Sequence, residues 1–245
     1  MNADLHRPTQ ARAIELGDTD ELSPARRRRG RPRRFDRGAA LAEAMRLFWE
    51  RGYEVTSIAD LTAAMGMKSP SLYAAFKDKE SLFLEAITLY VAEYGNLGIS
   101  GVLEQEPSAR KAIERWLLDA AYELTSAEHP RGCMVVSTSG NRTASGRRVN
   151  SAMAQRRFWA MVRLGCRIDA GVAAGELPAD TDAERLATFY MTVYQGMALQ
   201  ARDGASTKAL IATVRQAMLA WPRRDPLDVA LAPECLGGDH MIVEI

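Results

Sequence analysis

Apolar residues recur three and four positions apart along most of this 245-residue chain, and no convincing stretch alternates apolar with polar residues. The first spacing marks one face of an α-helix, whereas alternation would indicate a strand. The pattern therefore predicts an all-α fold. We expect helices over residues 36–51, 58–65, 70–76, 79–94, 110–126, 146–174, 181–202 and 206–221, with residues 96–107 as a connector.

Two of the expected helices are short and are separated by a glycine. The first has Thr56 or Ser57 as its N-cap and ends before Gly66, which permits a tight turn. The second begins with Ser69 as N-cap and Pro70 at the first helical position, where the missing N–H costs nothing. This is the sequence form of a helix-turn-helix, whose second helix enters the major groove of DNA.

The net charge of +1 hides an uneven distribution of charge along the chain. Residues 1–25 hold five acids and two arginines, a net of −3, whereas residues 26–37 hold eight arginines and one acid, a net of +7. A basic arm of this kind favours contact with a polyanion, since each arginine near a phosphate releases counterions. The alternative is a solvated basic run without a partner. The helix-turn-helix directly after the arm favours DNA.

The segments Arg51–Leu61 (RGYEVTSIADL), Met65-Gly66 and Ser71–Leu82 (SLYAAFKDKESL) closely resemble the TetR/AcrR family of transcriptional regulators. The resemblance implies a homodimer with a three-helix DNA-binding domain and a helical ligand-binding and dimerisation domain. It places the DNA-binding domain at residues 35–82 and the ligand-binding domain at residues 83–221. The extension with the basic arm (1–34) and the tail (222–245) hold prolines and glycines without a sustained apolar period, which predicts disorder. Residues 181–221 are apolar on more than one side, as a four-helix dimer interface requires.

The same resemblance assigns residues of the helix-turn-helix domain to double-stranded operator DNA, and the charge of the arm adds its arginines, which can lie in the adjacent minor groove. Phe76 corresponds to a buried position, and Pro70 and Ala75 depart from the residues common in the family, which leaves the operator sequence open. The expected DNA-binding residues are Arg28, Arg29, Arg31, Arg33 and Arg34 in the arm, and Thr56, Ser57, Lys68, Ser69, Pro70, Ser71, Tyr73, Lys77 and Lys79.

Aromatic and sulfur-containing side chains in the C-terminal part indicate an apolar or aromatic small-molecule inducer. For each of these residues taken individually, packing in the hydrophobic core is the alternative to ligand binding. The candidates are Trp116, Tyr122, Cys133, Met134, Phe158, Trp159, Tyr190 and Tyr194. We predict no cofactor.

Cys133 admits a second interpretation, because it follows Arg131 at an expected helix start, where a thiol pKa can fall. The run Pro130–Met134 is similar to a branch of the family with electrophile and copper responders, and His129 is a candidate second metal ligand. A small core residue is the alternative. The pair is too small for a zinc site, so we predict no metal.

No GxSxG, HExxH, P-loop or GxGxxG motif is present, so we predict that the chain is not an enzyme. The first residues lack the apolar region of a secretory signal and no run is long enough to span a membrane, which predicts a cytoplasmic protein. We expect a repressor that an inducer releases from a palindromic operator by moving the helix begun at Lys79. A ligand-independent architectural or adaptor DNA-binding protein, or a thiol- or metal-sensing repressor using Cys133, stays open.

Overall fold

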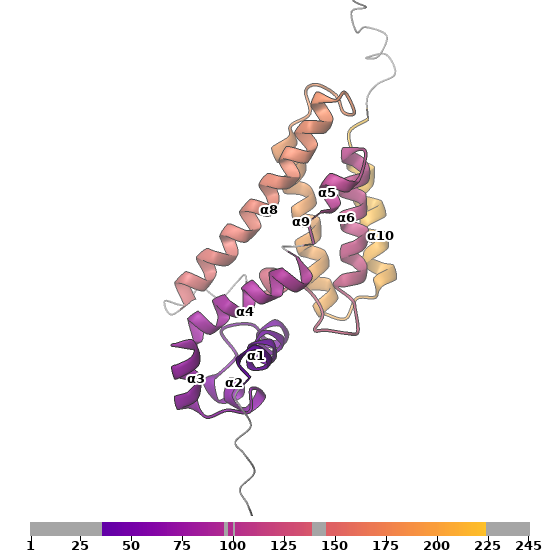
Figure 1. The fold of residues 1–245 in the computed structure, drawn as a ribbon. Helices are drawn as coiled ribbons and strands as arrows, with labels where there is room; N and C mark the ends of the chain where they lie inside the picture. Colours follow the sequence, from indigo (N-terminus) through magenta and orange to yellow (C-terminus); the bar gives the residue numbers. More distant parts are fainter. Residues whose placement is uncertain (1–35, 96–97, 100, 139–145, 224–245) are drawn as a thin grey trace, which may run out of the picture. The chain divides into compact units, whose positions relative to one another are not determined.

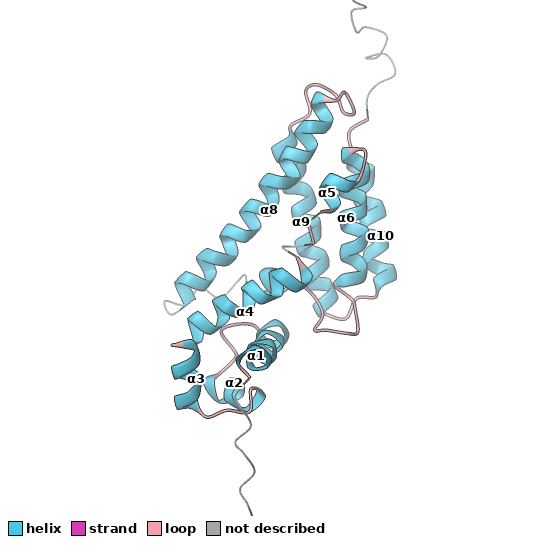
Figure 2. Cartoon of the chain, in the orientation of Figure 1, coloured by secondary structure: helices cyan, strands magenta, loops and turns pink. Residues whose placement is uncertain are grey.

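The computed structural model describes residues 36–95, 98–99, 101–138 and 146–223, and within these ranges all regular secondary structure is helical (Figures 1 and 2). This confirms the predicted all-α fold. The expected basic arm lies outside the described residues, as does most of the expected tail. The helices are α1 (Arg37–Arg51), α2 (Ile58–Ala64), α3 (Ser69–Phe76), α4 (Lys79–Tyr94), α5 (Val102–Gln105), α6 (Ala109–Glu123), α7 (Met134–Ser137), α8 (Arg147–Ala173), α9 (Ala183–Arg202) and α10 (Thr207–Ala217).

Helix α1 packs its apolar face on α4. Asp36 caps α1 by accepting hydrogen bonds from the N–H groups of Gly38 and Ala39, which would otherwise lack partners. Phe48 is fully buried and meets Phe83 of α4 edge to face, with the ring centroids 5.0 Å apart. These contacts fix the first helix against the first half of α4.

The predicted helix-turn-helix is present as α2, a turn and α3. Ser57 caps α2 in a capping box with Asp60, and Gly66 has φ +62° in the turn. Leu61 and Leu72 are fully buried and hold the two helices together. The cap of α3 was predicted wrongly: Lys68 is the N-cap and Ser69 is already helical, so Pro70 lies at the second position. Proline fits there equally well, since the first four N–H groups of a helix have no intrahelical acceptor.

Helix α4 runs without a break through residue 82, where sequence reasoning divides the DNA-binding domain from the rest (Figure 1). Beyond it, α9 packs against α6, α8 and α10. Sequence reasoning missed α5 inside the expected connector. It expected a helix start at Cys133, which is the N-cap of the four-residue α7, but gave that helix no range. One helical turn is too short to reveal a period in the sequence. No helix of the described residues combines the length and apolar character needed to cross a membrane.

Two glycines of α8 are expected to respond to alanine with opposite signs. A Cβ on Gly171 would lie 2.7 Å from Ala109 Cβ and 2.9 Å from Leu177 Cδ1, whereas the nearest such neighbour of Gly165 is Ala187 Cβ at 3.9 Å. Gly165→Ala should raise the free energy of unfolding by about 0.5–1 kcal/mol, because alanine is the better helix former. Gly171→Ala should lower it by about 1–3 kcal/mol through overpacking. Urea denaturation measures both, and a shared sign would contradict this packing.

Candidate nucleic-acid interface and ligand cavity

The outer side of α3 carries polar residues and its inner side carries apolar ones. Leu72 and Phe76 are buried, as predicted for Phe76, and Tyr73 is 48% exposed. The predicted DNA-binding residues on the outer side are Lys68, Pro70, Ser71, Tyr73 and Lys77, which are exposed, and Ser69, which is half-buried. Side chains at the start of a recognition helix are free in this arrangement to approach base edges and phosphates.

Thr56 does not belong to this surface, and its prediction as a DNA-binding residue was wrong. Its side chain is fully buried, and its hydroxyl donates a hydrogen bond to the Gly52 carbonyl at 2.7 Å. Ser57 is exposed, but its hydroxyl serves the cap of α2, donating to Asp60 Oδ2 at 2.6 Å and accepting from the Asp60 N–H at 3.1 Å. The hydrogen bonds from Ser57 lower the pKa of Asp60.

Lys79 begins α4 and already has contacts within the protein. Its Nζ lies 4.4 Å from the centroid of the Tyr53 ring and 3.5 Å from the Glu54 carbonyl oxygen. Burial lowers the pKa of Lys79, against the raising effect of Glu54. A phosphate contact by Lys79 stays a prediction, and so do all contacts by the arginines of the arm, because these lie outside the described residues.

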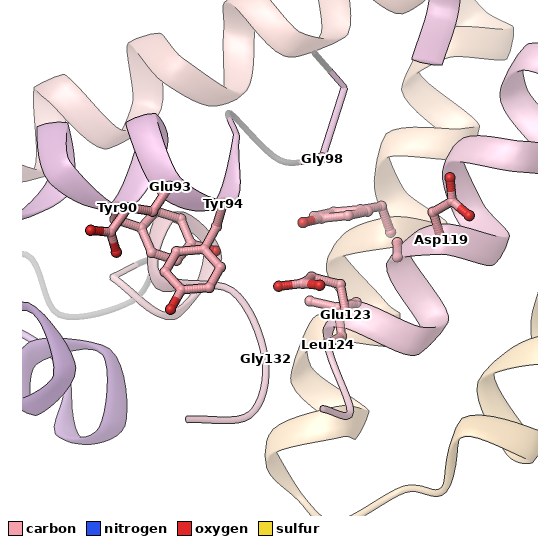
Figure 3. Close-up of a pocket in the computed structure, with 10 residues that line it drawn as sticks. Tyr90, Glu93, Tyr94, Gly98, Asp119, Glu123, Leu124 and Gly132 are labelled. Carbon is pink, nitrogen blue, oxygen red and sulfur yellow. The ribbon is translucent and has the colours of Figure 1, made fainter. Parts of the chain in front are cut away.

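A cavity of about 240 Å³ opens between α4, α6 and α9 (Figure 3). Tyr194 of α9 is the one predicted ligand-binding residue in its lining. Sequence reasoning missed the others, although residues 90, 93 and 94 share one helix face, as do residues 119, 120 and 123. The lining consists of Tyr90, Glu93, Tyr94, Gly98, Asp119, Ala120, Glu123, Leu124, Gly132 and Tyr194.

Of the remaining predicted ligand-binding residues, Cys133 lines a second cavity, and the others lie in the core or on the surface. Trp116 is buried and stacks on the cavity residue Tyr194, with ring centroids 5.1 Å apart and planes at 11°. Tyr190 and Met134 are buried in the core as well. Three others lie on the surface and do not line this cavity, so their part in ligand binding stays a prediction: Tyr122, Phe158 and Trp159 are 62%, 53% and 55% exposed. The helical spacing of apolar residues identifies the buried face of a helix. It does not identify which individual aromatic side chains reach a cavity.

Cys133 is the N-cap residue of α7 and lines a second cavity of about 540 Å³ beside α9, so its part in sensing or ligand binding stays a prediction. The thiol is fully buried, and the Tyr90 hydroxyl donates to its Sγ at 3.6 Å. Arg131 is directed to α9, where it donates to the carbonyls of Ala201 and Ala205, so its expected place beside the thiol was wrong. The arginine that interacts electrostatically with Cys133 is Arg157 of α8. Among the described residues no three His, Cys, Asp or Glu side chains form a cluster able to hold a metal ion.

His129 was a candidate partner of Cys133 and has other contacts. Its Nε2 lies 2.8 Å from Glu123 Oε1, and its Nδ1 lies 3.0 Å from the Pro130 carbonyl oxygen. Its ring stacks on the indole of Trp49, with centroids 4.5 Å apart and planes at 21°. Both ring nitrogens are therefore used, and neither faces a metal site.

Trp49 of α1 joins the DNA-binding helices to the cavity wall. The indole meets Tyr90 and Tyr94 edge to face at 4.7 and 4.8 Å, and its Nε1 donates to the Gly132 carbonyl at 3.0 Å. All three of these partners line the cavity. A movement of these lining residues would therefore change the contacts of Trp49 in α1 directly.

Comparison with known proteins gives matches along most of the chain. The family model described as "Bacterial regulatory proteins, tetR family" matches residues 40–86, and "Tetracyclin repressor-like, C-terminal domain" matches residues 110–218. The repressor ComR of Escherichia coli (strain K12) is 33% identical over 204 residues, which cover 83% of this chain and 97% of ComR. The repressor BdcR of the same organism is 28% identical and covers 77% of this chain and 90% of BdcR.

Solved structures give similar matches. A cysteine mutant of the TetR family transcriptional regulator CifR, complexed with 26-bp double-strand operator DNA, is 44% identical and has a TM-score of 0.73. The match covers 79% of this chain and 100% of the CifR chain. A TetR regulator from Rhodococcus sp. RHA1 is 32% identical, with a TM-score of 0.52 over 76% of this chain and 98% of that chain.

Proposed function

Because this chain belongs to the TetR family of bacterial regulatory proteins, we propose that it is a transcriptional repressor, released from a palindromic operator when a small molecule enters the cavity between α4, α6 and α9. One observation carries the proposal: a 44% identical protein that matches 79% of this chain is complexed with operator DNA. The relatives of this chain are transcriptional regulators, and the chain is likewise a transcriptional regulator and not an enzyme.

The outer side of α3 is the proposed base-reading surface. Lys68 and Ser71 are exposed at its start, and Tyr73 projects beside them. Arg28, Arg29, Arg31, Arg33 and Arg34 are proposed to follow the phosphates or the adjacent minor groove, where the negative potential is strongest. Phosphate contacts position the domain, whereas contacts from α3 select the sequence.

Two copies of the chain are proposed to bind one operator. Apolar side chains on α9 and just after α10 remain exposed, among them Leu199 at 59% and Leu219 at 64%. Two helices from each copy can bury such faces in a four-helix interface. The two recognition helices must then match grooves about 34–36 Å apart or a multiple of that distance.

Release is proposed to act through α4, because this helix belongs to both parts of the chain. Phe83 in its first half packs on Phe48 of α1, whereas Tyr90 and Tyr94 in its last turns line the cavity. A ligand that binds better to a second arrangement of α4 shifts the population toward it. The separation of the two recognition helices then changes, and the operator affinity falls.

The test of this function is selection of bound fragments from genomic DNA by the purified full chain. A palindromic site with half-sites one helical turn apart, or a multiple of that distance, is the expected result. Enrichment of DNA without a common palindrome contradicts the dimeric repressor and favours a sequence-independent architectural role.

Charge removal in the arm should lower the salt dependence of operator binding. If Arg28 and Arg29 each contact a phosphate, the double variant Arg28→Ala, Arg29→Ala reduces the slope of log affinity against log salt by about 1.8. Fluorescence anisotropy between 50 and 200 mM salt measures it. The matched control Arg110→Ala, Lys111→Ala removes two exposed charges from α6 and should keep the parent slope. Equal slopes for both variants would remove the arm from the interface.

The hydroxyl of Tyr73 is expected to contribute one hydrogen bond to a phosphate. Tyr73→Phe should raise the operator dissociation constant about fivefold, because a hydrogen bond contributes about 1 kcal/mol. Tyr122→Phe removes a hydroxyl from a similarly exposed ring on α6 and should leave operator affinity unchanged. An unchanged affinity for Tyr73→Phe would exclude a hydrogen bond from this hydroxyl to a phosphate.

A further inference from the structure

We propose that the cavity between α4, α6 and α9 accepts a small organic cation, bound by the Glu123 carboxylate and the faces of the cavity tyrosines. The inference rests on the proposed function and narrows its ligand class. It replaces the apolar or aromatic inducer expected from the sequence, because most of the residues on which that expectation was based do not line this cavity.

The lining of the cavity favours a positive charge and disfavours a negative one. It holds the rings of Tyr90, Tyr94 and Tyr194 and the carboxylates of Glu93, Asp119 and Glu123, and none of its described residues is Lys or Arg. The face of an aromatic ring is negative and attracts ammonium and guanidinium groups. An anion entering here would lose its hydration without gaining a cationic partner, which is costly.

Glu123 is the carboxylate best placed to bind such a cation. It projects from α6 across the cavity toward Tyr94 of α4 (Figure 3). Asp119, one turn earlier, is paired with the permanently charged guanidinium of Arg115 at 2.8 Å. The ion-pair partner of Glu123 is His129, which is charged only when protonated. A permanently charged or strongly basic ligand is therefore the stronger partner for this carboxylate.

The electrostatics of the cavity agree with a cationic ligand. The pKa of Tyr94 is raised, first by burial and then by Glu93, Glu123 and Glu128, with Arg46 acting in the opposite direction. The negative carboxylates near this ring therefore have a larger effect on its pKa than the positive guanidinium of Arg46. The rings of Tyr90 and Tyr94 are stacked with centroids 5.4 Å apart, and together they form one aromatic wall opposite Glu123.

Binding of a cation to Glu123 has a consequence for α1. The ligand competes with His129 for the carboxylate, and the His129 ring is stacked on Trp49 of α1. Trp49 also contacts Tyr90 and Tyr94 in the wall of the cavity. A cation between Glu123 and these tyrosines therefore alters both the stacking of His129 on Trp49 and the contacts of Trp49 with the tyrosines.

The experiment compares three probes of similar size with the full chain by isothermal titration calorimetry. The probes are the cation benzyltrimethylammonium, its uncharged isostere neopentylbenzene and the anion phenylacetate. We expect the cation to bind at least tenfold more tightly than either of the others. Equal or tighter binding of the uncharged or the anionic probe overturns the proposal.

A charge-removing variant tests the role of Glu123. Glu123→Gln should reduce the preference for the cation about tenfold or more, with the helical circular dichroism unchanged. Glu184→Gln, an exposed glutamate in the first turn of α9 that does not line the cavity, should change it less than twofold. An unchanged preference in Glu123→Gln overturns the assignment.

The operator selected by the full chain separates this proposal from the function on which it rests. Absence of sequence-specific binding by the ligand-free chain contradicts the repressor function itself. Normal operator binding together with no preference for the cation contradicts only the ligand class. Release of the operator by benzyltrimethylammonium, but not by phenylacetate, supports both.

Discussion

A Trp49→Ala variant is expected to unfold roughly 10 °C below the parent chain. Trp49 is 1% exposed, and its ring contacts Tyr90, Tyr94 and His129. Removal of a buried tryptophan side chain costs about 3–5 kcal/mol, through lost contacts and the cavity that remains. In a domain of this size each kcal/mol shifts the melting temperature by about 2–4 °C. Differential scanning calorimetry measures the shift.

Two further variants separate stability from signalling. Tyr122→Ala deletes an aromatic side chain that is 62% exposed and should change stability by less than about 0.5 kcal/mol. Trp49→Phe keeps an aromatic ring but loses the hydrogen bond from Nε1 to the Gly132 carbonyl. It should fold and bind the operator, with a weaker response to ligand. A full response in a stable Trp49→Phe variant would exclude this hydrogen bond from the coupling between cavity and α1.

The sequence predicted the long helices well, because each buries one continuous apolar face and has a recognisable end. Helix α1 ends before Gly52 and α4 before Gly95, both with positive φ, as their positions in the sequence predicted. The four-residue helix α5 was missed, since a single turn has no period, and α7 was expected only as a helix start at Cys133. The N-cap of α3 was predicted one residue too late. Serine is the better capping residue, so the sequence favoured Ser69, but the extended backbone before the helix is that of Lys68.

The candidate site was predicted less completely than the fold, for a physical reason. Side chains such as Leu72 and Phe76 are buried wherever a helix-turn-helix forms, so local sequence determines their place. The cavity instead depends on how α4, α6 and α9 meet, and on which of several aromatic residues faces inward. Tyr194 and Trp159 are both aromatic residues on predicted helices, yet Tyr194 lines the cavity and Trp159 is exposed.

Thr56 shows the same dependence on tertiary contacts. Its position before α2 suits both a cap and a phosphate contact, and sequence alone does not decide between these and burial. In the structure its hydroxyl satisfies the carbonyl at the end of α1, which joins the two helices. A threonine can cap a helix, contact DNA or bridge two helices. Its role can be assigned only when the positions of the neighbouring backbone groups are known.

The second large effect is expected at Gly132, which lies between the cavity, α9 and α1. It has φ +82°, and a Cβ there would lie 2.5 Å from Arg202 Cγ and 2.9 Å from the Ala198 carbonyl oxygen of α9. The arginine side chain can move, but the helix backbone cannot. Gly132→Ala therefore combines backbone strain with a steric conflict, and should lower the free energy of unfolding by roughly 3 kcal/mol.

Gly204→Ala is the matched control, because Gly204 also has a positive φ, +97°, but no atom within 4 Å of the added Cβ. It should show the backbone strain alone, about 1–2 kcal/mol. Urea denaturation of both variants gives the difference, which measures how firmly the segment around Gly132 is held against α9. Since the Gly132 carbonyl accepts the Trp49 hydrogen bond, a large difference should be accompanied by altered ligand response. Equal losses in the two variants would show that this segment moves away from α9 at little cost, and would argue against a rigid link from the cavity to α1.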